Sequence, residues 1–417
     1  MPITLLHSLG GDAGIHLENI IQKYNKTHEY QINSEVVLEG YAAAANAALE
    51  KPRIERPNII LAPEFMTGKL KLMAAQGEMI PVASLINEER LNDIAKIVKT
   101  TFGEYALPLN PACGVLYMNR TALAKIGKAP NWAPATFEEM VEASREMIKA
   151  GAVKHGFTCA WPQAYFVEVP LAQQNLPLVL PNNGEDGEGV YNFSQMQDHI
   201  LNLWHLRKEG VVLPPALKDF DAVQASFAAG DVGFFMQGSG HSKTVKTIAE
   251  TNGFESGCSA LPTLTAGQVD KYAFPLGGAA LWVMNTDEKD HVPGEENTLR
   301  MIDEVRSFLE YFSSPEVQRE WHEQTMYVPV SMTVLRILRE EGFYETHPVH
   351  KAVVDQTIGA PLGEYSFGIK TKNYSQARSE IYPLIYECIH LEGSEEDVKQ
   401  TIAGKLMAFD DKWSVDN

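Results

Sequence analysis

Two consecutive glycines, Gly277 and Gly278, stand directly before the apolar run Ala279–Met284. The run is short and rich in strand-forming residues, so it predicts a buried β-strand. Glycine lacks a Cβ atom, which lets the backbone adopt positive φ and lets a ligand approach bare N–H groups. The pair therefore indicates a place for a phosphate or carboxylate oxygen. A strand-entry turn with tight packing beneath it is the alternative.

A second candidate anion site is the loop Gln237–Ser242, which follows a predicted strand ending at Phe235 and leads into a helix. Ser239 brings a hydroxyl and the helix start brings N–H groups, a combination that binds anions. An ordinary serine cap is the alternative. Trp161 ends the predicted strand Phe157–Trp161 and is a candidate for lining a cleft, with a core position as the alternative.

Three early strands end on polar or aromatic residues that could hold a ligand. The predicted strands are Ile3–His7, Ile32–Leu38 and Asn58–Ala62, and they lead to His7-Ser8, Gly40-Tyr41 and Glu64. Ligands of open α/β sheets bind outside the carboxyl ends of strands, so His7, Tyr41 and Glu64 form one candidate group. Taken singly, Tyr41 could cap a helix, and Glu64 could be an acidic residue that a helix N-terminus favours.

The elements that must position these residues alternate along the chain as short apolar strands and amphipathic helices. This alternation predicts an α/β fold with a largely parallel sheet. Thr136 and Glu139 have the spacing of a capping box, and Pro315 is expected to begin a helix. The chain is predicted to cross first into a second lobe between residues 106 and 119, and to return after Pro262.

The bulk composition excludes several classes of protein. The chain has 417 residues, 45% of them hydrophobic, which is enough for two or three domains. Its formal charge of −19 argues against a nucleic-acid partner. No apolar run reaches the roughly 18–20 residues of a spanning helix, and we identify no signal peptide.

The four cysteines are far apart and form no metal-ligand spacing. We therefore expect free thiols, with one disulfide as the alternative. No metal and no cofactor are expected.

The chain also lacks the motifs of phosphate-ester enzymes. It has no P-loop, no HExxH, no GxSxG and no dinucleotide fingerprint in a strand–turn–helix context. The segment 10–14, Gly-Gly-Asp-Ala-Gly, follows a strand but lacks the full glycine spacing. An enzyme acting on an organophosphate is therefore kept only as an alternative to a binding protein.

The order of these signals resembles the ABC-transporter extracellular solute-binding proteins. The resemblance covers essentially the whole chain and rests on His7-Ser8, Gly40-Tyr41, Glu64, Leu116–Asn119, Phe227–Asp231, Gly277–Val283, Glu320–His322, Tyr327–Val330, Glu341–Tyr344 and Arg378. It implies the type II periplasmic-binding-protein fold, in which two discontinuous α/β domains are joined by a hinge and a ligand cleft lies between them. The implied lobes are 1–110 with 263–312, and 111–262 with 313–417.

The resemblance also implies a site for a small phosphorylated polyol. Tyr41 and Glu64 would hold polyol hydroxyls, and Trp161 would pack on the carbon chain. The phosphate would lie among Ser239, the Gly278 N–H, Tyr327 and Arg378, with His7, Asn110, Tyr165 and Gly277 as secondary candidates. This residue chemistry is suitable, because a guanidinium binds phosphate in a bidentate fork and hydroxyls complete the remaining contacts.

The chain departs from the family pattern at two places. Where the family has a phosphate-binding serine near the first crossing, this chain has Asn110-Pro111-Ala112-Cys113. Where the family has a second tryptophan three residues after Trp161, it has Ala164, followed by Tyr165. We therefore expect a ligand larger than, or different from, glycerol 3-phosphate, such as a glycerophosphodiester or a sugar or polyol phosphate. A sugar or oligosaccharide bound without phosphate preference is the alternative.

The resemblance further implies the substrate-binding component of an ABC importer, which catalyses no reaction. It would bind its ligand by hinge closure and deliver it to a membrane permease. We expect a monomer located in the periplasm or outside the cell, with the export signal absent from this sequence.

Overall fold

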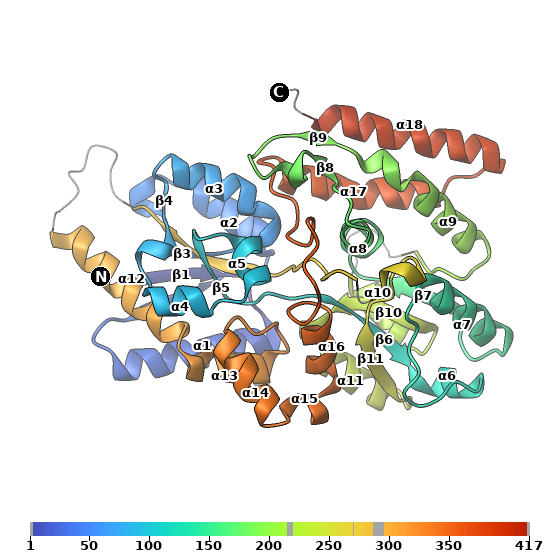
Figure 1. Cartoon of the computed structure of the whole chain (residues 1–417), viewed down its shortest axis with the longest axis horizontal. Coiled ribbons are helices and arrows are strands. Elements are labelled where there is room, and N and C mark those ends of the chain that lie inside the picture. Colours follow the sequence, from blue (N-terminus) through green and yellow to red (C-terminus); the bar gives the residue numbers. More distant parts are fainter. Residues whose placement is uncertain (1–2, 215–219, 270, 287–295, 415–417) are drawn as a thin grey trace. The chain divides into compact units, whose positions relative to one another are not determined.

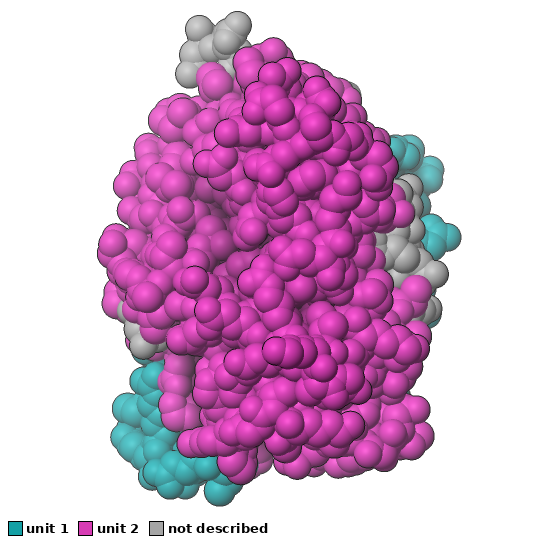
Figure 2. All heavy atoms as spheres, turned by 90° about the vertical axis from the view of Figure 1, so that its right-hand side faces the viewer, with its two compact units in different colours: residues 1–112, 276–346 teal, residues 113–275, 347–417 magenta. Residues whose placement is uncertain are grey.

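The computed structural model describes residues 3–214, 220–269, 271–286 and 296–414. The chain divides into two compact units, which are coloured separately in Figure 2. Unit 1 comprises Met1–Ala112 and Leu276–Thr346, and unit 2 comprises Cys113–Pro275 and His347–Asn417. The chain thus returns to unit 1 after Pro275 rather than after Pro262. Residues 313–346, which were predicted in the second lobe, belong to unit 1.

Unit 1 is built on a six-stranded sheet with the order β2-β1-β3-β12-β4, in which β5 also pairs with β12. Its strands are β1 (Ile3–His7), β2 (Ile32–Val36), β3 (Ile59–Pro63), β4 (Met79–Ile80), β5 (Ala106–Pro108) and β12 (Ala279–Met284). Strand β1 is parallel to β2 and β3, whereas β12 is antiparallel to β3, β4 and β5. The prediction of a largely parallel sheet is therefore wrong.

The reversed direction of β12 has a consequence for the site. Strand β12 begins the second segment of unit 1 and runs against β3, with Ala279 opposite Pro63. The start of β12 therefore lies beside the carboxyl end of β3. This register brings Gly277 and Gly278 next to Glu64, although more than 200 residues of chain separate them.

Unit 1 also contains the helices labelled in Figure 1. They are α1 (Gly11–Thr27), α2 (Tyr41–Glu50), α3 (Thr67–Ala75), α4 (Glu88–Asp93), α5 (Lys96–Phe102), α12 (Glu296–Phe312), α13 (Pro315–Thr325), α14 (Met332–Glu340) and α15 (Phe343–Thr346). Leu17 of α1 and Phe308 of α12 share one core with Leu61 and Leu281 of the sheet. Neighbouring strand residues point to the opposite face, where Trp282 is also fully buried.

Unit 2 has its own four-stranded sheet with the order β11-β6-β10-β7. Its strands are β6 (Gly114–Asn119), β7 (His155–Cys159), β10 (Val232–Gly238) and β11 (Ser256–Ala260), and β8 (Val179–Leu180) pairs separately with β9 (Val190–Tyr191). Strand β10 is parallel to β7 and antiparallel to β6. Because β11 pairs with β6, the segment before Pro262 stays in unit 2.

The helices of unit 2 are α6 (Arg120–Lys125), α7 (Phe137–Lys149), α8 (Val169–Gln173), α9 (Gln197–Lys208), α10 (Phe220–Ala228), α11 (Ser242–Thr251), α16 (Pro348–Asp355), α17 (Tyr374–Ile389) and α18 (Glu395–Trp413). Thr136 caps α7 as predicted, since its hydroxyl accepts from the Glu139 N–H at 3.1 Å. The Glu139 carboxylate accepts from the Ala135 N–H instead of the Thr136 N–H, at 2.7 Å. Only half of the capping box is therefore formed.

Two further features of the chain concern membrane-spanning helices and the cysteines. Over the described ranges of the chain, no helix is both long and apolar enough to cross a membrane. All four cysteines are free thiols, and Cys113, Cys159 and Cys388 are buried. Burial raises the pKa of the Cys113 thiol to about 12, so it stays protonated at neutral pH.

Candidate ligand-binding site

Several predicted site residues of unit 1 gather at one edge of its sheet. Tyr41 is the first residue of α2, Glu64 follows β3, and Asn110 follows β5. Gly278 precedes β12 and Tyr327 follows α13. We call these five residues the unit-1 half-site. They come from five separate stretches of the chain, which the tertiary fold brings together.

Asn110 connects the two tyrosines of the unit-1 half-site. Its amide Nδ2 donates to the Tyr41 hydroxyl at 3.2 Å, and the amide also influences the pKa of Tyr327. The two hydroxyls interact electrostatically with each other. Burial raises the pKa of both tyrosines, which keeps their hydroxyls protonated and able to donate.

Asn110 also has an acceptor that is not used. The side chain is only 2% exposed, and its Oδ1 atom has no hydrogen-bond partner among the described residues. A buried carbonyl oxygen without a donor costs free energy. A ligand that carries a hydroxyl could supply the missing donor, so Asn110 remains a candidate for ligand binding.

Gly278 is required by the backbone around it. Its φ is +94°, and a Cβ atom there would lie 2.0 Å from the Asn110 carbonyl oxygen. Its own carbonyl accepts from the Glu64 N–H at 3.0 Å. Gly278 therefore lies in a strand-entry turn, which was the alternative prediction for the glycine pair. A turn at this position is compatible with ligand binding. The Gly278 N–H donates to no other residue within the described ranges, and the residue is partly exposed.

Tyr327 is held by residues that the sequence did not single out as site residues. Its ring stacks on Trp321, with centroids 5.9 Å apart. The buried His322 donates from Nδ1 to the Tyr327 carbonyl at 2.6 Å, and its Nε2 accepts from the Tyr344 hydroxyl at 3.1 Å. The resemblance already included His322 and Tyr344, but residue type alone did not indicate this support.

His7 lies away from the unit-1 half-site contacts. Its ring is 1% exposed, and Nδ1 accepts from the Leu9 N–H at 3.2 Å. Its Nε2 donates to the Ser34 hydroxyl at 2.9 Å, with the Glu18 carboxylate 3.3 Å away. Burial lowers the His7 pKa. Both ring nitrogens have protein partners, so we leave His7 out of the proposed site.

In unit 2, the predicted residues Trp161 and Ser239 lie at the ends of neighbouring strands. The Trp161 Nε1 donates to the Gln237 side-chain oxygen at 3.0 Å, and the Gly238 N–H donates to the same oxygen at 2.7 Å. Trp161 is partly exposed. Ser239 is fully buried, and its hydroxyl has no hydrogen-bond partner of ordinary length among the described residues.

Arg378 lies within α17 rather than before it, and it pairs with a carboxylate. Its Nε donates to Glu168 Oε1 at 2.6 Å, and its Nη2 lies 3.3 Å from Oε2. The Tyr374 hydroxyl donates to Glu168 Oε1 at 2.5 Å. The predicted phosphate-binding guanidinium therefore has an anionic protein partner, which the sequence did not indicate.

Tyr165 links the predicted residues of unit 2. Its ring packs so closely on Gly114 that a Cβ there would lie 2.3 Å from Tyr165 Cε1. Burial raises the pKa of Tyr165, with smaller upward contributions from Cys159, Cys113 and Glu168 and an opposing contribution from Arg378. Ser239 in turn lies beside Cys113, because its backbone N–H donates to the Cys113 carbonyl at 2.9 Å. Arg378, Tyr165 and Ser239 thus lie in one region, which we call the unit-2 half-site together with Trp161.

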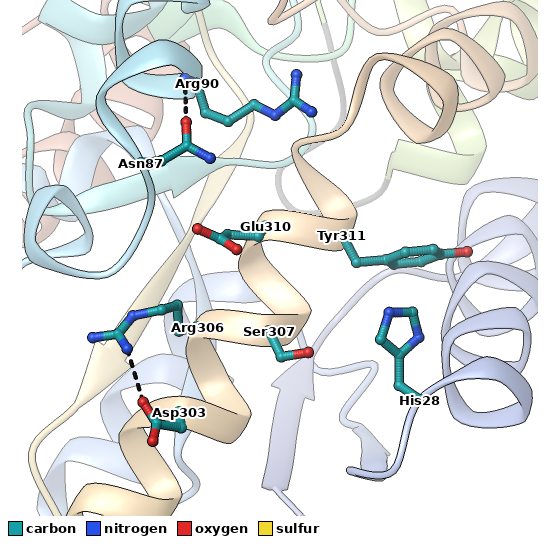
Figure 3. Close-up of a pocket in the computed structure, with 8 residues that line it drawn as sticks. All are labelled: His28, Asn87, Arg90, Asp303, Arg306, Ser307, Glu310 and Tyr311. Atoms are coloured by element: carbon teal, nitrogen blue, oxygen red, sulfur yellow. Dashed lines mark hydrogen bonds and ion pairs between the residues drawn. The ribbon is translucent and has the colours of Figure 1, made fainter.

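A separate cavity of about 440 Å³ opens on unit 1 (Figure 3). It is lined by His28, Asn87, Arg90, Asp303, Arg306, Ser307, Glu310 and Tyr311. Arg306 and Asp303 form an ion pair of 2.8 Å along α12. No predicted site residue lines this cavity, and its charged groups have both signs. We therefore do not assign the ligand to it. Within the described residues, no cluster of His, Cys, Asp and Glu could hold a metal ion.

Similarity to known proteins decides the family of this chain. A sequence profile of the bacterial extracellular solute-binding proteins matches residues 19–348. The chain belongs to this family. It is therefore the substrate-binding component of an ABC importer and not an enzyme. Its ligand and a permease are its partners, and its location is periplasmic or extracellular.

Relatives with assigned names match most of this solute-binding protein. It is 26% identical over 393 residues to the sn-glycerol-3-phosphate-binding periplasmic protein UgpB of Yersinia enterocolitica, covering 91% of this chain and 85% of that protein. It is also 26% identical over 390 residues to UgpB of Escherichia coli K12, covering 90% and 85%.

Solved structures confirm the fold. UgpB of Mycobacterium tuberculosis in complex with glycerophosphocholine superposes with a TM-score of 0.70 at 16% identity, over 99% of both chains. The acarbose-binding GacH receptor of Streptomyces glaucescens gives a TM-score of 0.72 at 16% identity, again over 99% of both chains. At such identities the likeness concerns the fold alone.

Proposed function

We propose that this solute-binding protein binds a small phosphorylated polyol. The candidates are glycerol 3-phosphate, a glycerophosphodiester, or a sugar or polyol phosphate. The observation that carries the proposal is the unit-1 half-site, where the Glu64 carboxylate follows β3 and the Asn110 Oδ1 acceptor is buried without a donor. Hydroxyl groups of a polyol donate to both kinds of acceptor.

The phosphate is proposed to bind Ser239, Arg378, the Tyr327 hydroxyl and the Gly278 N–H. The buried Ser239 hydroxyl has no protein partner of ordinary length within the described ranges, and a phosphate oxygen would supply one. The UgpB relatives, which bind sn-glycerol 3-phosphate by their names, support the same ligand class.

We further propose that both half-sites bind opposite parts of one ligand. Closure of the units about a hinge would then complete contacts that neither unit makes alone. The ligand would shift the open–closed equilibrium by its differential affinity for the closed form. In this proposal a monomer in the closed form delivers the ligand to the permease.

A second candidate ligand is a sugar or oligosaccharide without a phosphate. The observation in its favour is that Arg378 pairs with Glu168, which reduces the charge available to a phosphate. Trp161 presents partly exposed ring surface, and aromatic surfaces of this kind pack well on sugar rings. A structural neighbour binds cyclic α-maltosyl-1,6-maltose.

Calorimetric titration of the purified protein separates these candidates. The panel is glycerol 3-phosphate, glycerol, inorganic phosphate and maltose. We expect the phosphorylated polyol to bind tightest, and removal of its phosphate to weaken binding roughly 100-fold, because charge-assisted hydrogen bonds are lost. Tightest binding to maltose would contradict the proposal.

A further inference from the structure

Glu168 is the residue that faces Arg378 within unit 2. The two side chains are 14% and 12% exposed and form a nearly bidentate pair, with N–O distances of 2.6 and 3.3 Å. Tyr374 adds a third donor to the same carboxylate. These three donors hold the Glu168 carboxylate in place beside Arg378 of the unit-2 half-site.

The local structure explains why Glu168 reaches Arg378. Residues Ala164–Glu168 form a π-helical turn directly before α8. Such turns are rare and insert an extra residue into a helix, which redirects the side chains that follow. On the opposing element, Tyr374 and Arg378 are four residues apart on α17, so they lie on the same face of that helix. Both can therefore donate to one carboxylate.

The cluster places a negative charge directly beside the Arg378 guanidinium. Arg378 contributes one positive charge and Glu168 one negative charge. Burial raises the pKa of Tyr374 and of Tyr165 well above the ordinary value, so both hydroxyls are neutral. The buried Lys370, just before α17, is likewise paired, with Glu185 at 2.7 Å. An anionic ligand beside Arg378 would therefore also meet the Glu168 carboxylate.

Phosphate esters differ in how well they suit such a cluster. A phosphomonoester carries a charge of about −1.5 to −2 at pH 7, with a second pKa of about 6. A phosphodiester has a single ionisable oxygen and carries one negative charge. Repulsion from a fixed carboxylate grows with ligand charge, and it is strong at short range in a partly buried site.

We propose that Glu168 is a specificity-determining residue that makes the site prefer phosphodiesters to phosphomonoesters. The inference rests on the proposed function, since it requires a phosphate group beside Arg378. Glu168 cancels part of the attraction that Arg378 exerts on a second phosphate charge. The diester loses less by this cancellation than the monoester does.

The test compares two ligands that differ by one methyl group and one charge. They are sn-glycerol 3-phosphate and its methyl diester, titrated calorimetrically into the wild-type protein and the Glu168→Gln variant at about pH 7.5. We expect the wild type to prefer the diester. We expect Glu168→Gln to tighten monoester binding about tenfold more than diester binding. Loss of the Glu168 charge relieves more repulsion for the doubly charged monoester than for the singly charged diester. An unchanged ratio of the two affinities in the variant would overturn the proposal.

A second measurement needs no variant. As pH falls from about 7.5 to about 5.5, the monoester gains a proton and loses its second charge. We expect wild-type affinity for the monoester to approach that for the diester over this range, while diester binding changes little. A constant monoester-to-diester ratio across the range would also overturn the proposal, even if Glu168→Gln fails to fold.

The Glu78→Gln variant is the matched control. Glu78 is 16% exposed and pairs with Arg53 and Arg56 in unit 1, so the substitution removes the same charge from a similarly buried ion pair. It should leave the ratio of the two affinities unchanged. If neither phosphate ester binds the wild type while maltose does, the proposed function fails. If both esters bind but the ratio of their affinities is the same in the wild type and in Glu168→Gln, only the inference about Glu168 fails.

Discussion

At the scale of single residues, the Asn110 amide connects the two tyrosine hydroxyls of the unit-1 half-site. The Asn110 amide and both hydroxyls come from separate stretches of the chain, so their mutual interactions help to hold them in place before a ligand arrives. A hydrogen-bonded network of this kind loses more than the sum of its parts when one member is removed, because the remaining groups reorient. The network should therefore behave as a unit in ligand binding.

The Tyr41→Phe and Tyr327→Phe variants test this network. Each removes one hydroxyl that Asn110 contacts, and each should weaken glycerol 3-phosphate binding. Because the two hydroxyls also interact electrostatically, the effects should not add, and a double-mutant cycle should give a coupling free energy of about 1 kcal/mol. Calorimetric titration of the wild type, both single variants and the double variant measures it.

The control for this cycle is Tyr30→Phe, in the segment between α1 and β2 of the same unit. Tyr30 belongs to no part of the unit-1 half-site, so its removal should leave affinity unchanged. Strictly additive effects of Tyr41→Phe and Tyr327→Phe would show that the two hydroxyls act independently.

At the scale of elements, the turn before β12 positions the unit-1 half-site. The backbone of Gly278 passes so close to Asn110 that no side chain fits between them. The Gly278 carbonyl also binds the Glu64 N–H. A single turn therefore sets the spacing of Glu64 and Asn110, and glycine is needed there for both conformation and space.

The Gly278→Ala variant should disturb both folding and binding. Its Cβ would clash with the Asn110 carbonyl at 2.0 Å, and its φ of +94° is unfavourable for alanine. We expect a loss of about 3 kcal/mol in the free energy of unfolding, measured by chemical denaturation. Ligand affinity should fall as well, because Asn110 must move.

Gly77→Ala is the matched control in unit 1. Gly77 has a φ of +74°, but a Cβ atom added there would have no neighbouring atom within 4 Å. The variant should lose only about 1 kcal/mol, from backbone strain alone. Equal losses for Gly77→Ala and Gly278→Ala would contradict the importance of the close approach to Asn110.

At the scale of the whole molecule, each unit is assembled from two chain segments. The chain leaves unit 1 at Ala112 and returns at Leu276, after building most of unit 2. Residues of both half-sites are therefore drawn from distant parts of the sequence. If both half-sites bind one ligand, damage to either should weaken the same interaction.

Glu64→Gln in unit 1 and Trp161→Ala in unit 2 test that expectation. Each should weaken binding of the same phosphorylated polyol by about tenfold or more, since one removes a charged acceptor and the other a packing surface. Trp132→Ala, in unit 2 but outside the half-site, is the control for loss of a tryptophan. Full retention of affinity in either test variant would show that its half-site does not contact the ligand.

The sequence by itself determined the α/β class, the position of most strands and the family, because strand patterns and glycine turns are local signals. It also indicated Tyr41, Glu64 and Gly278 as candidates, since Tyr41 and Glu64 follow predicted strands and Gly278 directly precedes one. Only the tertiary structure decided which residues pair: β12 runs antiparallel to β3, residues 313–346 belong to unit 1, and Glu168 faces Arg378. The physical reason is that strand direction, domain membership and ion pairing depend on contacts between segments far apart in the chain, and no local pattern encodes those contacts.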